Sequence, residues 1–239
     1  MGKQKGMYLH GKLENVLYYS WKGIPCERII PATVYQSPVV IAHRNANGLS
    51  TTMGASFRKL LANVTPYPKK MKMQTAVRIA LLKWLKGGPV NSEPPVSVPF
   101  ISGLSFNETS RLKNCLKVPI TFALNAPNEF VLRIPEMIPT SAFNAPARTD
   151  HIQLKIAAAC CNITTGEELQ NYNHYITIPY NSVSIASHTI SFLLQTPVNS
   201  LTIVVIALDY FRNVKETSSL ILQECFRPSQ VIGAVVKLL

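Results

Sequence analysis

The spacing of hydrophobic and polar residues changes along the chain, from β-like alternation to a helical period and back. Near the start, two extended runs, residues 13–19 and 24–31, flank a turn at Trp21-Lys22-Gly23. Aromatic and β-branched residues are enriched in both runs, and glycine is a common turn residue. This pattern predicts a β-hairpin within residues 7–31.

Two amphipathic helices are predicted next. Apolar residues recur every three or four positions between Asn47 and Val64, and the prolines that follow would end this helix. Either Asn47 or Ser50 is suited to cap its start by accepting a backbone N–H bond. A second helix is predicted from Lys70 to Lys86, because the Gly-Gly-Pro sequence after it is a strong stop signal.

From about residue 118 the chain returns to short β-like runs separated by turn residues. The candidate strands are 118–124, 130–134, 151–161, 174–180, 188–195, 201–211, 218–226 and 231–238. The run Ile203–Leu208 is continuously apolar, which predicts a central strand buried on both faces. Cys160 and Cys161 are neighbours on a predicted strand, so they should point to opposite faces and act as small core residues. This number and spacing of strands predicts an immunoglobulin- or fibronectin-like antiparallel β-sandwich.

Composition and charge both change near residues 90–100, within a stretch rich in proline and serine. We therefore expect an α+β protein with two domains. Residues 1–95 would form a basic segment of one hairpin and two helices, and residues 96–239 would form the β-sandwich.

The net charge of +12 is concentrated at one end. Residues 1–90 contain 14 Lys and Arg and 2 Glu, whereas residues 91–239 contain 10 basic and 10 acidic residues. This asymmetry indicates an anionic partner, such as nucleic acid, a membrane surface or an acidic patch on another subunit. A solvated basic face is the alternative. The candidate anion contacts are Lys12, Lys22, Lys69, Lys72, Lys83 and Lys86.

The N-terminal stretch also resembles a known family. The resemblance rests on Gly11, Lys12, Asn15, Val16, Trp21, Lys22, Gly23, Arg28 and Pro31. These residues are similar to the opening motif of a family of uncharacterised basic proteins common in Bacteroidota. Gln36, Arg44 and Phe57 match the residues with which that family continues. The resemblance implies a second helix and a β-rich C-terminal half, and it implies no known activity.

Sequence signatures of enzymes are absent. The chain has no dinucleotide-binding or phosphate-binding glycine motif, no nucleophile elbow and no His-Glu-x-x-His pair. Its five cysteines include no Cys-x-x-Cys, so we expect no zinc site. The two aspartates, Asp150 and Asp209, are too few for clustered magnesium ligands. We therefore expect no catalytic activity and no cofactor.

Signals that direct a chain to a membrane are also missing from the sequence. Its longest apolar run, Ile203 to Leu208, is far shorter than the roughly 20 residues of a membrane-spanning helix. No secretory signal is visible at the start. We expect a cytoplasmic protein or one held within an assembled particle.

Charged residues make up only 15% of the chain and hydrophobic residues 47%, which favours burial against other copies. The leading hypothesis is a structural protein that self-assembles into a homo-oligomer, filament or phage-like particle. The alternatives are a non-specific nucleic-acid-binding protein that uses the basic segment, and a soluble carbohydrate-binding module. The candidate assembly residues are Tyr18, Tyr19, Trp21 and Arg28. For Trp21 two interpretations stay open: a core residue near Trp84, or an exposed anchor on a neighbouring subunit, which the adjacent turn favours.

Overall fold

The computed structural model describes most of the chain. The described residues are 3–5, 8–31, 36–65, 71–87, 96–97, 101–126, 128–214 and 217–237. The chain divides into two compact units, Met1–Ala42 and His43–Leu239. The division therefore falls after Ala42, and not between residues 95 and 96 as composition predicted.

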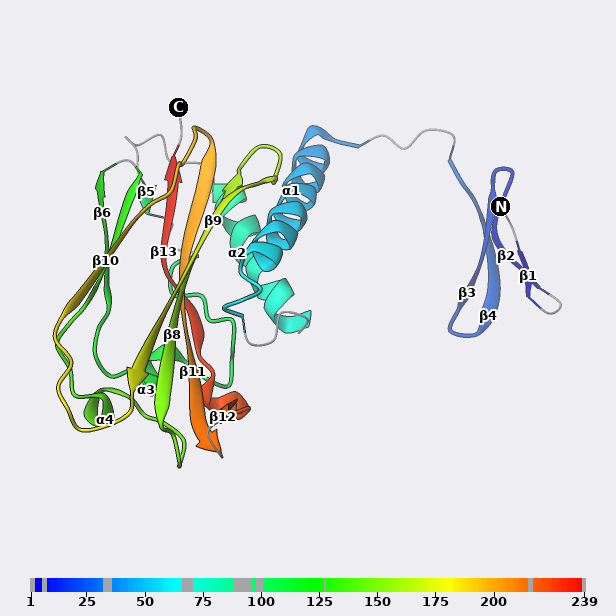
Figure 1. Ribbon diagram of the computed structural model, residues 1–239. Helices are drawn as coiled ribbons and strands as arrows, with labels where there is room; N and C mark the ends of the chain where they lie inside the picture. Colours follow the sequence, from blue (N-terminus) through cyan, green and yellow to red (C-terminus); the bar gives the residue numbers. More distant parts are fainter. Residues whose placement is uncertain are drawn as a thin grey trace. The chain divides into compact units, whose positions relative to one another are not determined.

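The first unit contains an antiparallel sheet (Figure 1). Its strands pair in chain order as β1 (Lys3–Lys5), β2 (Tyr8–Leu13), β3 (Val16–Trp21) and β4 (Ile24–Ile29). The predicted hairpin is confirmed as β3 and β4, joined by Lys22 and Gly23, which both have positive φ, at 51° and 85°. A two-residue turn of this kind matches the twist of the strands it connects.

A second reversal, between β2 and β3, was not predicted. Glu14, with a φ of 51°, and Asn15 connect these strands, so the predicted run 13–19 is interrupted here. Asn15 is a common turn residue, but no glycine or proline accompanies it in the turn, so the local signal is weaker than at Lys22-Gly23.

The first helix, α1 (Pro38–Leu60), begins nine residues before the expected start at Asn47. Pro38 suits the first helical position because its missing N–H would have no partner there. The Ser37 hydroxyl caps the helix by accepting the N–H of Val40 at 3.4 Å. The alternative cap, Ser50, is fully buried on the core face of the helix. The second helix, α2 (Met71–Gly87), agrees with the prediction.

The second unit is β-rich, so the chain is an α+β protein. Its larger sheet has the order β5 (Val96–Ser97), β13 (Ser229–Lys237), β11 (Ser200–Val214), β8 (His151–Asn162) and β9 (Glu168–Pro179), and β12 (Thr217–Leu220) pairs with β11. The smaller sheet has the order β10 (His188–Leu193), β7 (Glu129–Ile134) and β6 (Thr121–Ala126). Short helices α3 (Leu112–Cys115) and α4 (Pro139–Ala142) lie in the connections. The expected strand 218–226 is correct only to Leu220, because Glu224–Phe226 forms a 3₁₀ turn.

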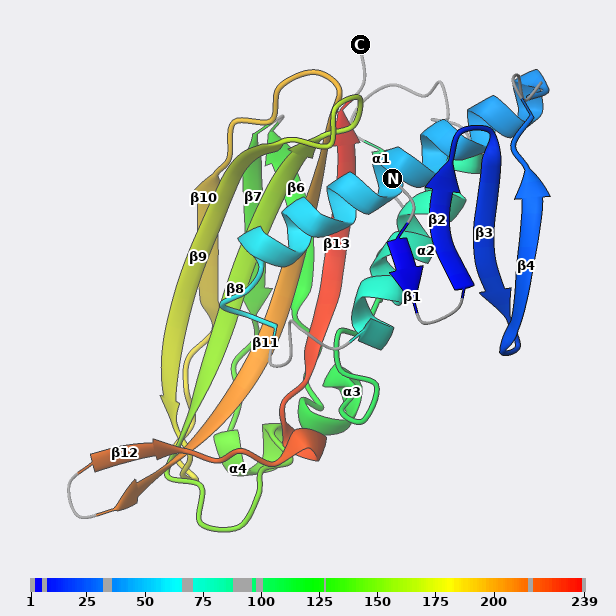
Figure 2. The same ribbon diagram turned by 90° about the vertical axis from the view of Figure 1, so that its right-hand side faces the viewer.

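Two hydrophobic cores lie on opposite faces of the larger sheet. One core joins α1 and α2 to β8, β11 and β13, and the other joins the larger sheet to β6, β7 and β10. Figure 2 shows both helices along one face of the larger sheet. Because the apolar stripes of the helices are buried in this core, α2 and most of α1 belong to the same unit as the sheets.

Strand β11 confirms the prediction of a central strand. It pairs with β8 on one side and β13 on the other, and its residues from Ser200 to Tyr210 are all buried. Cys160 and Cys161 also behave as predicted: both are fully buried, and they lie in different cores.

Two glycines allow close packing in this unit. Gly166, with a φ of 76°, lies against α1, where an added Cβ would be 2.9 Å from the Thr52 side chain. The carbonyl of Gly166 accepts a hydrogen bond from the Ser56 hydroxyl at 2.8 Å. Gly233 in β13 lies so close to Phe122 of β6 that an added Cβ would be 2.5 Å from its ring.

Candidate binding surface of the N-terminal sheet

The register of β2, β3 and β4 decides which side chains share a face, because paired residues lie on the same face and neighbours in a strand alternate. Lys12 pairs with Leu17, and Leu17 pairs with Arg28. Along the same face, Tyr19 pairs with Cys26 and Trp21 pairs with Ile24. We call this the cationic face, and its residues are Lys12, Leu17, Tyr19, Trp21, Ile24, Cys26 and Arg28.

The other side of the sheet has a different composition. We call it the opposite face, and its residues are Leu13, Val16, Tyr18, Ser20, Pro25, Glu27 and Ile29. It contains one acidic residue and no basic residue. The register therefore separates the four candidate assembly residues: Tyr19, Trp21 and Arg28 lie together on the cationic face, and Tyr18 lies on the opposite face.

Strands β2, β3 and β4 have no buried core on either face. No residue from Tyr8 to Pro31 is buried. On the cationic face Trp21 and Ile24 are each 63% exposed, and on the opposite face Ile29 is 73% exposed. Trp21 is exposed on this sheet and Trp84 is buried in the core that α2 forms with the larger sheet, and the role of Trp21 as an anchor stays a prediction.

The cations of the cationic face lack protein partners. Lys12 and Arg28 are exposed, and neither makes a hydrogen bond or ion pair with another described residue. Lys22 is exposed in the turn between β3 and β4.

The remaining candidate lysines do not add to this surface. Lys83 and Lys86 are exposed on α2, in the second unit. Lys69 and the side chain of Lys72 lie outside the described residues.

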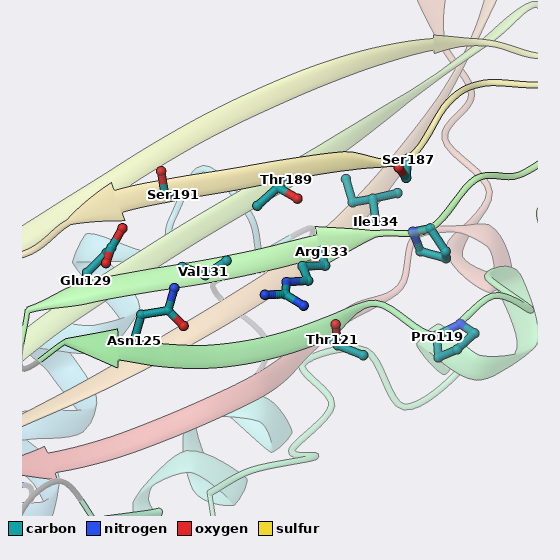
Figure 3. Close-up of a pocket in the computed structure, with 11 residues that line it drawn as sticks. Pro119, Thr121, Asn125, Glu129, Val131, Arg133, Ile134, Ser187, Thr189 and Ser191 are labelled. Atoms are coloured by element: carbon teal, nitrogen blue, oxygen red, sulfur yellow. The ribbon is translucent and has the colours of Figure 1, made fainter.

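A groove on the outer face of the smaller sheet is a second candidate site (Figure 3). Its volume is about 670 Å³, and β6, β7 and β10 supply most of its lining. Its polar side chains, none of which bonds to another described residue, are Thr121, Asn125, Glu129, Arg133, Ser187, Thr189 and Ser191. Polar side chains are expected on the solvent face of an antiparallel sheet, so this lining alone does not indicate a ligand.

A cluster of charges lies within the second unit. The Asp209 carboxylate is 2.6 Å from Nζ of Lys155 and 2.9 Å from Nε of Arg227. All three side chains are at most 18% exposed. The cluster connects β8 and β11 to the segment that precedes β13, and sequence reasoning missed it because the three residues are far apart in the chain.

The described part of the chain shows neither a metal-binding cluster nor an activated buried thiol. No group of three or more His, Cys, Asp or Glu residues is placed to hold a metal ion there. Burial raises the pKa of the Cys115, Cys160 and Cys161 thiols, which disfavours the nucleophilic thiolate. Within the described ranges, no helix combines the length and apolar character needed to cross a membrane.

In comparisons with known proteins, no protein-family model, no curated protein and no solved structure matches the chain. The resemblance to the Bacteroidota family therefore stays a prediction.

Proposed function

We propose that this protein is a non-enzymatic structural protein that assembles with copies of itself through its N-terminal unit. One observation carries the proposal: large exposed apolar side chains are concentrated in this unit. Of the 19 such side chains in the described residues, ten lie within the first 42 positions. Exposed apolar groups at this density, in strands β2 to β4 where no residue is buried, are typical of a surface that a partner covers.

The opposite face is the part of the unit best suited to contact another copy. Leu13 and Ile29 provide exposed apolar area there, and Glu27 is its one charge. The rest of the chain, residues 43–239, has 19 basic and 10 acidic residues, a net charge of +9. A surface with one carboxylate and no cation is compatible with that basic body, whereas a cationic surface would be repelled by it.

The first turn of α1 extends this apolar character. Val39, Val40 and Ile41 are exposed by 65%, 50% and 38%, and all three fall within the first unit. A helix start that presents three consecutive apolar side chains to water supports the same proposal.

For the second unit we infer an immunoglobulin- or fibronectin-like sandwich. The orders β6-β7-β10 and β9-β8-β11-β13 correspond to A-B-E and C′-C-F-G of that topology, and this correspondence supports the inference. Such a domain is a scaffold on which many functions occur, so it adds a framework for assembly and no activity.

The test is the size of the full-length protein in solution, measured by light scattering across a range of concentrations. We expect particles larger than the 26.5 kDa monomer. Ile29→Asn should shift the distribution towards monomer, because it removes an exposed apolar side chain from the opposite face. Leu222→Asn is the matched control, since Leu222 is 70% exposed but lies in the second unit.

A wild-type protein that stays monomeric at high micromolar concentration would contradict the proposal. Equal dissociation by both substitutions would show that the contact is not specific to the N-terminal unit.

A further inference from the structure

We infer that the cationic face of the N-terminal sheet binds single-stranded nucleic acid without sequence preference. This inference goes beyond the proposed self-assembly, because it concerns the other side of the sheet and a different class of partner. It rests on the combination of unpaired cations and exposed aromatic rings on one surface.

The charges of this face are available to an anion. Lys12 and Arg28 lie at opposite ends of one row across β2, β3 and β4, and they have no partner among the described residues. Neither acidic residue of the unit belongs to this face, since Glu27 is on the opposite face and Glu14 is in a turn. A phosphate backbone supplies the missing negative charge, and its binding releases counterions.

The rings of this face provide the second interaction. Tyr19 is two positions along β3 from Leu17, which lies in the Lys12–Arg28 row, and Trp21 is two positions farther. Successive rows on one face of a strand are about 6.8 Å apart. The face thus presents phosphate contacts at one end and two stacking surfaces beyond them, in a line that an extended strand of nucleotides can follow.

Single strands fit this arrangement better than duplexes. An aromatic ring stacks on a base only where the base is not already stacked between its neighbours, as in unpaired segments. Such stacking accepts any base, because every base has a π-face. No sequence preference is therefore expected.

A membrane surface or an acidic protein would also satisfy the cations. Both can also accept exposed aromatic side chains, but neither calls for rings spaced by successive rows of a strand beyond the cations, as consecutive bases do. The row of rings therefore favours nucleic acid over these two partners.

The binding assay uses the full-length protein and a deoxythymidine oligonucleotide of roughly 16 nucleotides, the upper end of site sizes on comparable platforms. The protein has two tryptophans, and Trp84 is buried. In a Trp84→Phe background, the fluorescence of Trp21 therefore reports directly on this face. We expect quenching of Trp21 on binding, and an affinity that falls steeply as salt is raised.

Two neighbouring tyrosines provide a matched pair of variants. Tyr19 lies on the cationic face and Tyr18 on the opposite face of the same strand. Tyr19→Leu keeps an apolar side chain but removes the ring, so affinity should fall about 5- to 150-fold, the range measured for loss of one stacked base. Tyr19→Phe keeps the ring and should retain binding, and Tyr18→Leu should bind as the parent does.

The cation contacts have their own signature. Arg28→Gln should reduce the magnitude of the slope of log affinity against log salt by about 0.7, the value for one contact to a single strand. Lys83→Gln, on α2, should leave the slope unchanged.

Three results would each overturn the inference. The first is equal loss of binding in Tyr18→Leu and Tyr19→Leu, and the second is equal or tighter binding of duplex. The third is an effect of Tyr19→Leu on particle size with no effect on nucleic-acid binding, which would make this face a protein contact. Self-assembly is measured without nucleic acid, so the two proposals can fail independently.

Discussion

The substitution Gly233→Ala tests whether the two sheets of the second unit approach each other as closely as described. Gly233 lies in β13 and faces Phe122 of β6. A Cβ at this position would be 2.5 Å from Cδ1 and Cε1 of Phe122 and 3.0 Å from Cζ. Carbon atoms that are not bonded prefer separations of about 3.5–4.0 Å, so the ring or the backbone must shift by roughly 1 Å.

The ring of Phe122 has little freedom to move away. It packs against the core between the sheets and stacks on Phe130, with ring centroids 6.1 Å apart. Overpacking of this kind typically costs about 1–3 kcal/mol. For a unit of this size each kcal/mol lowers the melting temperature by about 2–4 °C. We therefore expect Gly233→Ala to lower the melting temperature by about 2–12 °C.

Circular dichroism melts of the wild type, Gly233→Ala, Phe122→Leu and the double variant form a double-mutant cycle. Phe122→Leu removes the ring, so Gly233→Ala should cost less in that background, by at least about 0.5 kcal/mol. Gly48→Ala is the opposite control: Gly48 is exposed within α1 and has no atom within 4 Å of an added Cβ. There the substitution should stabilise by about 0.5–1 kcal/mol, because alanine favours the helix. If Gly233→Ala melts like the wild type, or is additive with Phe122→Leu, the close approach is refuted.

Two further predictions concern buried charge and the two tryptophans. Asp209→Asn should lower the free energy of unfolding in urea by about 3–5 kcal/mol, because Lys155 and Arg227 lose the carboxylate between them while staying mostly buried. A decrease below about 1 kcal/mol would show that water screens the cluster. Trp84→Ala truncates a core residue and should cost about 3–5 kcal/mol of stability. Trp21→Ala should leave the melting temperature unchanged, and a large decrease in that temperature would mean that the Trp21 ring is buried in the folded protein.

Part of the candidate surface was predictable from alternation alone. In a strand, neighbouring residues point to opposite faces, so Tyr18 and Tyr19 could not both contribute to one interface. Pro38 preceded by Ser37 is a common helix start, and it would have extended α1 to its true beginning. The start near Asn47 was favoured because the buried stripe begins there, while the first turns of α1 are exposed and leave no periodic signal.

By itself, the sequence determined features that depend on local chemistry. The stop of α2 follows from a glycine–proline signal, the reversal at Lys22-Gly23 from a glycine that accepts positive φ, and the burial of β11 from an uninterrupted apolar run. The alternation of a strand likewise placed Cys160 and Cys161 in different cores. Each of these features depends on residues within a few positions of one another.

Only the tertiary structure decided features that depend on which distant segments meet. Asp209 joins Lys155 and Arg227 across three parts of the chain, and Gly233 is needed because β6 supplies Phe122. The division of the chain at Ala42 belongs to the same class. The apolar stripes of the helices could have been buried against the N-terminal hairpin or against the later strands, and their spacing is the same in both cases. Both faces of the larger sheet are apolar. The smaller sheet buries one of them, and the helices bury the other, so the helices belong to the second unit.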